Sequence, residues 1–352
     1  MTPTLDDVLA RLREEGLYEA DAAPSLDEGP AARADPWYVR TLLVVGAWMA
    51  GVLFVLFLSA TSWLREAGPS LATGLVLVAG ALGLRPRLRG LFLEQLAFAL
   101  SLAGQFMVAS GLGRLVGWEA STWAALGLLE ALLVLLYPDA LHRLVSTGLA
   151  VGALTLAIAE LGMPGLVQLL LLGCATGMVG LWEAEHRMIV AGLADRTRPV
   201  ARGLAVSLAG LLLLPVTDAP PFASLPWWPV TLGLAGLLAV VAVRLLRDLD
   251  VPAWTRTPGL VLLMVLVVVV LLTRDTPGIV GALLLLALGF RHGRPVVMGL
   301  AVAFLAVFLS IFYYQMSRTL LEKAFLLSAT GGVLLVLRWA FRRFTGLPPG
   351  TP

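Results

Sequence analysis

The chain has 352 residues, of which 59% are hydrophobic and 14% are charged, and its mean hydropathy is +0.90. Soluble domains carry about 25% charged residues, so this composition excludes an ordinary soluble protein. The net charge of +2 gives no indication of a nucleic-acid partner, because the arginines are spread over short segments between apolar runs. The single cysteine, Cys174, lies inside an apolar run, which excludes a disulfide framework and a thiolate metal site.

The sequence predicts that residues 1–36 are a cytoplasmic segment, which consists of a short amphipathic helix and a linker. The apolar residues at its start recur at the spacing of one helix face: Leu5, Val8, Leu9 and Leu12. The favoured interpretation is an arm that rests on its own membrane domain, and the alternative is a docking peptide for another protein. The acidic, polar start, with no apolar run before Tyr38, predicts that no signal peptide is cleaved.

Repeated apolar runs of membrane-spanning length predict an all-α, polytopic integral membrane helix bundle. We expect about twelve transmembrane helices within a membrane domain at 37–343, followed by a short cytoplasmic tail at 344–352. The expected spans are 38–60, 68–84, 91–112, 121–137, 143–160, 163–184, 200–216, 228–246, 258–273, 277–290, 295–314 and 320–341. The longest loop, 185–199, suggests two halves at 37–184 and 200–343.

The basic residues predict which side of the membrane each loop occupies. With twelve spans and a cytoplasmic N-terminus, the cytoplasmic loops and ends hold twenty of the 25 basic residues. The other five lie on the opposite side: Arg65, Arg114, Arg274, Arg318 and Lys323. Positively charged loops stay in the cytoplasm, so this asymmetry predicts that both termini are cytoplasmic.

Ionisable residues at membrane depth are costly and mark candidate functional sites. Glu130 lies about 10 Å of helix rise from Tyr137, with apolar residues on both sides. The spans at 91–112 and 121–137 are neighbours in the chain, so we expect one cytoplasm-facing polar site that joins them. Its candidate members are Glu130, Glu94, Gln95 and Ser101, and the counter-charge is either Arg143 or the cluster of Arg85, Arg87 and Arg89. The site is either a proton or cation site or a polar contact that only holds helices together.

A second polar group lies at the turn before the last expected span, on the side with the shortest loops. It predicts a partner surface formed by Tyr313, Tyr314, Gln315, Arg318, Glu322 and Lys323. Thr319 and Glu322 have the spacing of a capping box, which begins the last helix. The alternative is a set of interfacial charges that are solvated or paired with one another.

Signatures of an enzyme are missing from the sequence, so we expect no catalysis and no cofactor. The three histidines, His142, His186 and His292, fall in separate expected loops without a neighbour at metal-ligand spacing. No histidine is expected at membrane depth to activate a serine there, and no phosphate-binding glycine loop is present.

Two segments carry a resemblance to a known family. The segment 36–40 (PWYVR), followed by Gly46 and Trp48, and the segment 313–323 (YYQMSRTLLEK), followed by Gly331, Gly332 and Arg338, are both typical of it. In these segments the chain resembles a family of bacterial inner-membrane proteins, domain of unknown function 4401. The family often has a serine after the lysine, where this chain has Ala324. The resemblance implies a multi-pass protein of the bacterial inner membrane, encoded beside small membrane proteins that are candidate partners.

Two functions follow from these patterns. The first is a non-enzymatic subunit or partner of an envelope complex, embedded in the lipid bilayer and in contact with other small membrane proteins. The alternative is a proton- or cation-coupled transporter that uses the intramembrane Glu130.

Overall fold

The structure is a computed structural model that describes the middle of the chain. The described residues are 36–60, 65–88, 90–217, 221–222, 224–248, 264, 267, 270–271, 273–274 and 276–315. The expected arm at 1–36, most of the span expected at 258–273, the last span at 320–341 and the tail at 344–352 therefore lie outside the described residues.

The described part of the chain is helical and contains no strand. Its first five helices are α2 (Trp37–Ala60), α3 (Ala67–Leu84), α4 (Leu91–Leu115), α5 (Ala120–Leu136) and α6 (Ala140–Glu160). They are followed by α7 (Leu166–Glu183), the short α8 (Glu185–Val190), α9 (Ala194–Leu211), the 3-10 turn η3 (Leu214–Val216), α10 (Trp228–Asp248), α12 (Pro277–Arg291) and α13 (Pro295–Gln315).

Among these described helices, eight are long and apolar enough to cross a membrane. Two more expected spans form the shorter helices α5 and α12, with 17 and 15 residues. At 1.5 Å per residue they extend about 26 and 22 Å, less than the roughly 30 Å of a hydrocarbon core. The total of twelve spans and the cytoplasmic location of both termini stay predictions.

Helix boundaries differ from the expected spans at several ends, among them the starts of α6 and α9. Helix α6 begins at Ala140 instead of residue 143, because the Asp139 side chain accepts a hydrogen bond from the His142 backbone N–H and caps the helix. Helix α9 begins at Ala194 instead of residue 200, so α8 and the first turn of α9 fill the expected loop at 185–199. The expected turn around residues 161–163 is confirmed, since α6 ends at Glu160 and α7 begins at Leu166. At the other expected turn, around 274–276, α12 begins directly afterwards at Pro277, while most of the preceding span lies outside the described residues.

Helices α3 and α4 approach closely through glycines that face each other. A Cβ atom added to Gly74 would lie 2.6 Å from the Gly104 carbonyl oxygen and 2.7 Å from the Val108 backbone nitrogen. Such small residues let backbones approach, which is how helices gain packing energy in a membrane. The Ser70 hydroxyl adds a hydrogen bond across the pair, 3.1 Å from the Met107 carbonyl oxygen.

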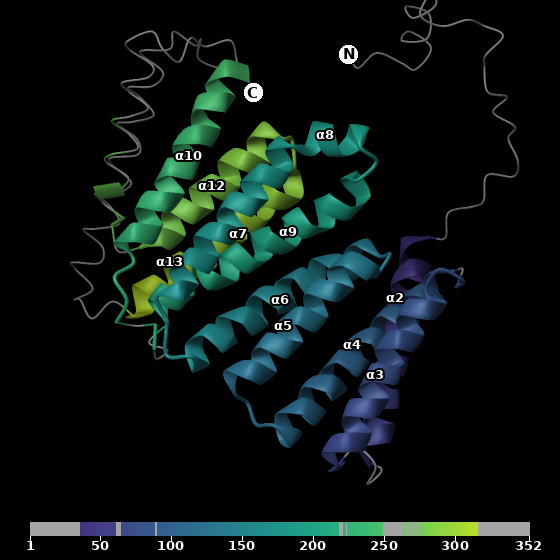
Figure 1. Ribbon diagram of the computed structural model, residues 1–352. Coiled ribbons are helices and arrows are strands. Elements are labelled where there is room, and N and C mark those ends of the chain that lie inside the picture. The colour runs from purple at the N-terminus through teal and green to yellow at the C-terminus, as the bar shows by residue number, and fades with distance from the viewer. Residues whose placement is uncertain are drawn as a thin grey trace, which may run out of the picture.

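Figure 1 shows α2, α3 and α4 side by side at one flank, α7 to α13 at the other, and α5 and α6 between them. The largest apolar core lies among α7 to α13, and its fully buried members include Leu208, Leu234, Leu284 and Phe308. This core joins residues from both expected halves, because α7 packs with α9 and α10. A separate small apolar cluster links α4, α5 and α6 through Val108, Leu126 and Ala153.

Candidate functional site

Buried polar side chains gather where α4 faces α5 and α6. The members of this polar chain are Ser101 and Gln105 from α4, Glu130 from α5, and His142 and Ser146 from α6. Ser101, His142 and Ser146 have no exposed surface, and Gln105 and Glu130 are each 6% exposed. Buried polar groups are costly unless they bond to one another, and here each member reaches another.

His142 is the centre of the polar chain, because both of its ring nitrogens have partners. Its Nε2 atom lies 2.8 Å from the Ser101 hydroxyl and 3.3 Å from the Gln105 amide nitrogen. Its Nδ1 atom lies 3.2 Å from the Ser146 hydroxyl. The imidazole therefore connects α4 to a hydroxyl one turn further along α6.

The contacts of His142 favour one tautomer. With the Gln105 amide NH₂ facing Nε2, the arrangement in which Nε2 accepts and Nδ1 carries the proton satisfies every contact of the ring. The Nδ1–H group then donates to the Ser146 hydroxyl oxygen. That leaves the Ser146 proton free to be donated onward.

Glu130 is the acceptor at the end of the polar chain. Its carboxylate is close enough to the Ser146 hydroxyl to interact with it, and its Oε2 atom has no hydrogen-bond partner among the described residues. None of the described arginines forms an ion pair with it. Glu130 lies about 9 Å of helix rise before the end of α5, within an otherwise apolar sequence.

Aromatic rings hold His142 in place. The Tyr137 ring stacks on the imidazole with a centroid distance of 3.7 Å, and the Phe98 ring meets it edge-on at 5.7 Å. Trp48 of α2 packs against the far side of Phe98 at 5.3 Å. The imidazole orientation is thus set by packing as well as by hydrogen bonds.

An ion-pair cluster lies beside the polar chain and is less deeply buried. The Arg85 guanidinium, just after α3, binds Glu94 of α4 at 3.2 Å and Asp139 at the start of α6 at 3.1 Å. Since Asp139 also caps α6 three residues before His142, the cluster joins the α2–α4 group to the helix that carries the histidine. The Glu94 side chain is 34% exposed, so this end of the arrangement is not covered by the described protein.

The structure brings together only part of the site expected from the sequence. Ser101 and Glu130 belong to the polar chain, and Glu94 belongs to the neighbouring ion-pair cluster. Gln95 faces α2 instead, where its Oε1 atom accepts a hydrogen bond from Trp48 Nε1 at 3.3 Å. Arg143 points toward α9, and its Nη1 atom lies 3.4 Å from the Asp195 carbonyl oxygen, so it is not the counter-charge of Glu130.

The expectation that His142 lies in a loop is wrong. It occupies the first turn of α6 and is fully buried, because Asp139 begins the helix three residues earlier than expected. The sequence Tyr137-Pro138-Asp139 carried the signal, since an aspartate after a proline is a strong helix start. Ser146 and Gln105 were not expected members of the site either.

Half of the expected outer partner surface lies beyond the described helices. Tyr313 and Tyr314 fall in the last turn of α13, and Tyr314 is 83% exposed. Gln315 ends that helix, and Arg318, Glu322 and Lys323 are outside the described residues. The partner surface therefore stays a prediction from the sequence.

A second charged cluster joins the ends of α7, α8, α10 and α12. Glu183 binds both Arg244 and Arg291, and Arg291 also binds Asp248 at 2.7 Å. The described residues contain no group of three or more His, Cys, Asp or Glu that is arranged to hold a metal ion. The arrangement therefore consists of ion pairs that tie helix ends together.

Glu185 extends this charged cluster, as it binds Arg198 at 2.8 Å and also Arg294. Burial alone would raise the pKa of the Glu185 carboxyl, but the hydrogen bonds from Arg294 and Arg198 outweigh it, so the pKa lies below its ordinary value. Burial, with the Arg291 charge, lowers the pKa of the nearby His292.

We expect His292 to make the protein less stable as the pH falls. An unfolded histidine binds a proton near pH 6.5, while folded His292 does so only at lower pH, so its contribution to stability is present above pH 6.5 and is lost below it. In the His292→Gln variant, the melting temperature in detergent should fall less between pH 7.5 and pH 5.5 than in the wild type. Parallel curves for the two proteins would contradict this assignment.

These features define the class of protein. The described chain is an all-helical bundle whose long apolar helices indicate a membrane-embedded protein, with a polar chain buried between three of the helices. A comparison with protein families matches residues 36–344 to the domain of unknown function DUF4401. The chain therefore belongs to this family, as the resemblance in its first and last spans predicted. Comparisons with curated proteins and with solved structures give no match.

Proposed function

We propose that this protein moves protons across the membrane, and that the polar chain from Ser101 through His142 and Ser146 to Glu130 is the path. The observation that carries the proposal is a buried set of hydrogen bonds from Ser101 through His142 to Ser146, beside the buried Glu130 carboxylate. Each linking group is a hydroxyl or an imidazole, and each of these both accepts and donates a proton.

The geometry supports a transfer in which every proton is accounted for. The Ser101 hydroxyl gives its proton to Nε2 of His142 while the Ser101 oxygen takes up the incoming proton. The ring becomes a cation and then releases its Nδ1 proton to the Ser146 oxygen. Ser146 passes its own hydroxyl proton to the Glu130 carboxylate, which becomes a neutral acid. The imidazole is left in its other tautomer, and rotation or reprotonation restores it before the next proton.

A structural role for the same groups is the competing interpretation. Polar side chains between helices in a membrane also act as adhesive contacts, and each contributes about 0.6 kcal/mol. Two observations favour proton movement. First, the ionisable groups Glu130 and His142 both interact with the Ser146 hydroxyl. Second, none of the described arginines neutralises the Glu130 carboxylate. Intramembrane carboxylates of this kind are typical of proton pathways.

The Ser101–His142 pair also has the separation of a nucleophile and its base, which is a feature of hydrolases. We propose a non-enzymatic role, because both side chains are fully buried and no carbonyl group of a substrate has access to the Ser101 hydroxyl. The role of a subunit in an envelope complex stays a second proposal. It depends mainly on Arg318, Glu322 and Lys323, which lie outside the described residues.

Proton flux in vesicles tests the proposal. The purified protein would be reconstituted into liposomes that enclose a pH-sensitive dye, and a potassium gradient with valinomycin would impose a membrane potential. We expect the wild type to acidify or alkalinise the interior at least about tenfold faster than protein-free vesicles. Glu130→Gln keeps the shape of the side chain but removes its ionisation, so its flux should fall to the protein-free rate.

Glu119→Gln is the matched control, because it makes the same chemical change at an exposed position just before α5. We expect it to keep the wild-type flux. A wild-type flux no greater than that of protein-free vesicles would overturn the proposal. So would a Glu130→Gln variant that conducts protons at the wild-type rate.

A further inference from the structure

An apolar groove runs between α2 and α4. The two helices touch where Gly51 meets Ala99, and a Cβ atom added to Gly51 would lie 2.8 Å from the Ala99 Cβ atom. Beyond this contact a space of about 270 Å³ opens between the helices. Its apolar lining includes Trp48, Val52 and Val55 from α2 and Ala99, Ala103 and Phe106 from α4.

One end of the groove is polar and positively charged. A smaller cavity of about 110 Å³ shares Val55 and Phe106 with the groove, and it is also lined by Arg65 and Arg114. Arg114 Nη1 donates to the Arg65 carbonyl oxygen at 3.1 Å, which keeps the two arginines close. The hydroxyl-bearing Ser70 and Ser110 complete this polar end.

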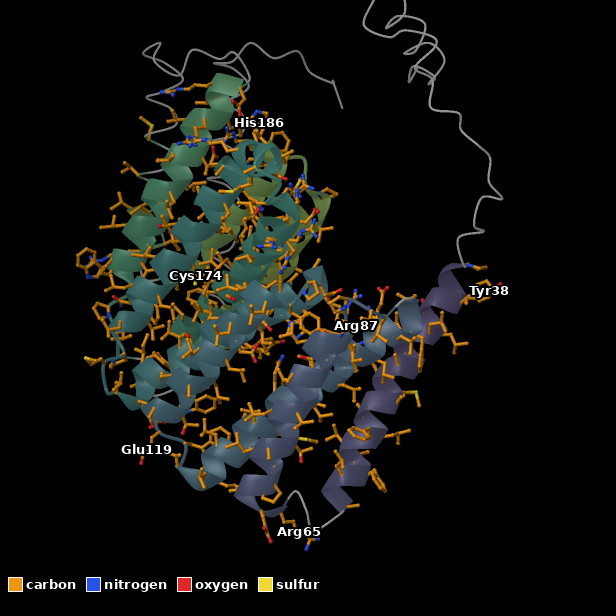
Figure 2. All side chains as sticks on the ribbon, turned by 45° about the vertical axis from the view of Figure 1, so that its right-hand side comes forward. Tyr38, Arg65, Arg87, Glu119, Cys174 and His186 are labelled. Atoms are coloured by element: carbon orange, nitrogen blue, oxygen red, sulfur yellow. The ribbon has the colours of Figure 1, made fainter. Side chains whose placement is uncertain are left out.

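The length of the groove matches one leaflet of a bilayer. Ala99 and Arg114 are 15 residues apart on α4, which is about 22 Å of helix rise. The hydrocarbon layer of one leaflet is about 15 Å thick, and the headgroup region adds several more ångströms. Figure 2 shows Arg65 and Arg87 at opposite ends of α3, with Arg65 at the lower end. The arginines therefore lie at headgroup level when the apolar groove lies at acyl-chain level.

We propose that this groove binds one anionic phospholipid. The acyl chain would lie along Phe106, Val52 and Trp48, and the phosphate would be bound by Arg65 and Arg114. Guanidinium groups recognise phosphate through paired, charge-assisted hydrogen bonds, and two arginines complement its negative charge. The acyl chain of a zwitterionic lipid fits the apolar part of the groove equally well, but the cationic group of its headgroup is repelled by the arginines.

The inner end of the groove also lies close to the polar chain. Trp48 lines the groove and packs on Phe98, and Phe98 packs on His142. The lipid site is independent of the proposed proton movement, since it rests on a different cavity and different residues.

Native mass spectrometry of the detergent-solubilised full chain tests this site. The probes are phosphatidylglycerol and phosphatidylcholine with the same acyl chains. We expect one phosphatidylglycerol to bind about tenfold more tightly than phosphatidylcholine, and the double variant Arg65→Gln, Arg114→Gln to remove this preference. Val52→Trp should weaken the binding of both lipids, because the indole fills the apolar groove. Val52 is exposed, so the larger side chain does not disturb the protein core.

Two control variants make the same changes elsewhere. Arg87→Gln removes an exposed arginine at the opposite end of α3, and Val302→Trp adds an indole on the exposed face of α13. Both should bind the lipids as the wild type does. Equal affinity of the wild type for the two lipids would overturn the proposal. The proposal would also fail if the double arginine variant kept its preference for phosphatidylglycerol. The same holds if Val52→Trp bound the lipids as tightly as Val302→Trp does.

Discussion

Replacing Ser146 by alanine is expected to lower proton flux in vesicles by at least about tenfold and to leave the fold intact. The Ser146 hydroxyl bonds to His142 Nδ1 and also interacts with the Glu130 carboxylate, so its removal leaves a methyl group where the two ionisable groups shared a hydroxyl. Proton transfer needs a donor and an acceptor within hydrogen-bond distance, and alanine provides neither. The effect on stability should be small, about 1 kcal/mol, because one hydrogen-bonded hydroxyl is lost from a buried position.

Ser207→Ala is the matched control for this experiment. Ser207 is also a buried serine on a membrane helix, but its hydroxyl donates only to the Gly203 carbonyl oxygen of its own helix, at 2.8 Å. We expect its flux to equal that of the wild type. The reactivity of the buried Cys174 with a maleimide reports whether each variant is folded. If both serine variants conduct equally, the relay does not pass through Ser146.

Replacing Gly74 by valine is expected to destabilise the protein by about 3 kcal/mol, the upper part of the usual range for an overpacked site. The added Cβ atom would lie 2.6 Å and 2.7 Å from backbone atoms of Gly104 and Val108. Backbone atoms of a helix do not move aside as a side chain does, so α3 and α4 must separate along their length. The variant should therefore melt at a lower temperature, as measured by circular dichroism in the same detergent.

Gly80→Val provides the comparison on the same helix. An added Cβ atom at Gly80 meets no neighbouring atom within 4 Å, so there is no backbone contact to disturb. Valine has a higher helix propensity than glycine, and the variant should be as stable as the wild type or more stable by roughly 0.5 kcal/mol. Equal melting temperatures for the Gly74 and Gly80 variants would show that close packing of α3 on α4 contributes little.

The helices themselves were predictable from the sequence, because long apolar runs have few alternatives. A segment such as 91–112 satisfies its backbone hydrogen bonds within one helix and is apolar enough for lipid, and α4 was found there. Boundaries were less predictable where a helix starts with polar residues. Helix α9 begins with Ala194-Asp195-Arg196, which composition alone assigns to a loop.

The candidate site was only partly predictable, since burial depends on neighbours. Glu130 was identified because a carboxylate in an apolar membrane helix is costly whichever way the helix is turned, so the sequence alone marks it. His142 was missed because its distance from Ser101 arises from the contact between α4 and α6, which are 41 residues apart at this point. The direction in which Arg143 and Gln95 point depends on the same packing.

Composition and hydrophobic length by themselves determined that this protein is a helical membrane protein, because solvation of apolar side chains and of the backbone acts on each segment independently. Only the tertiary structure decided which polar groups meet. Hydrogen bonds act over about 3 Å, and that separation is set by how neighbouring helices rotate and pack. His142, which the sequence assigned to a loop, is therefore the centre of the polar chain, whereas the adjacent Arg143 contacts α9 instead.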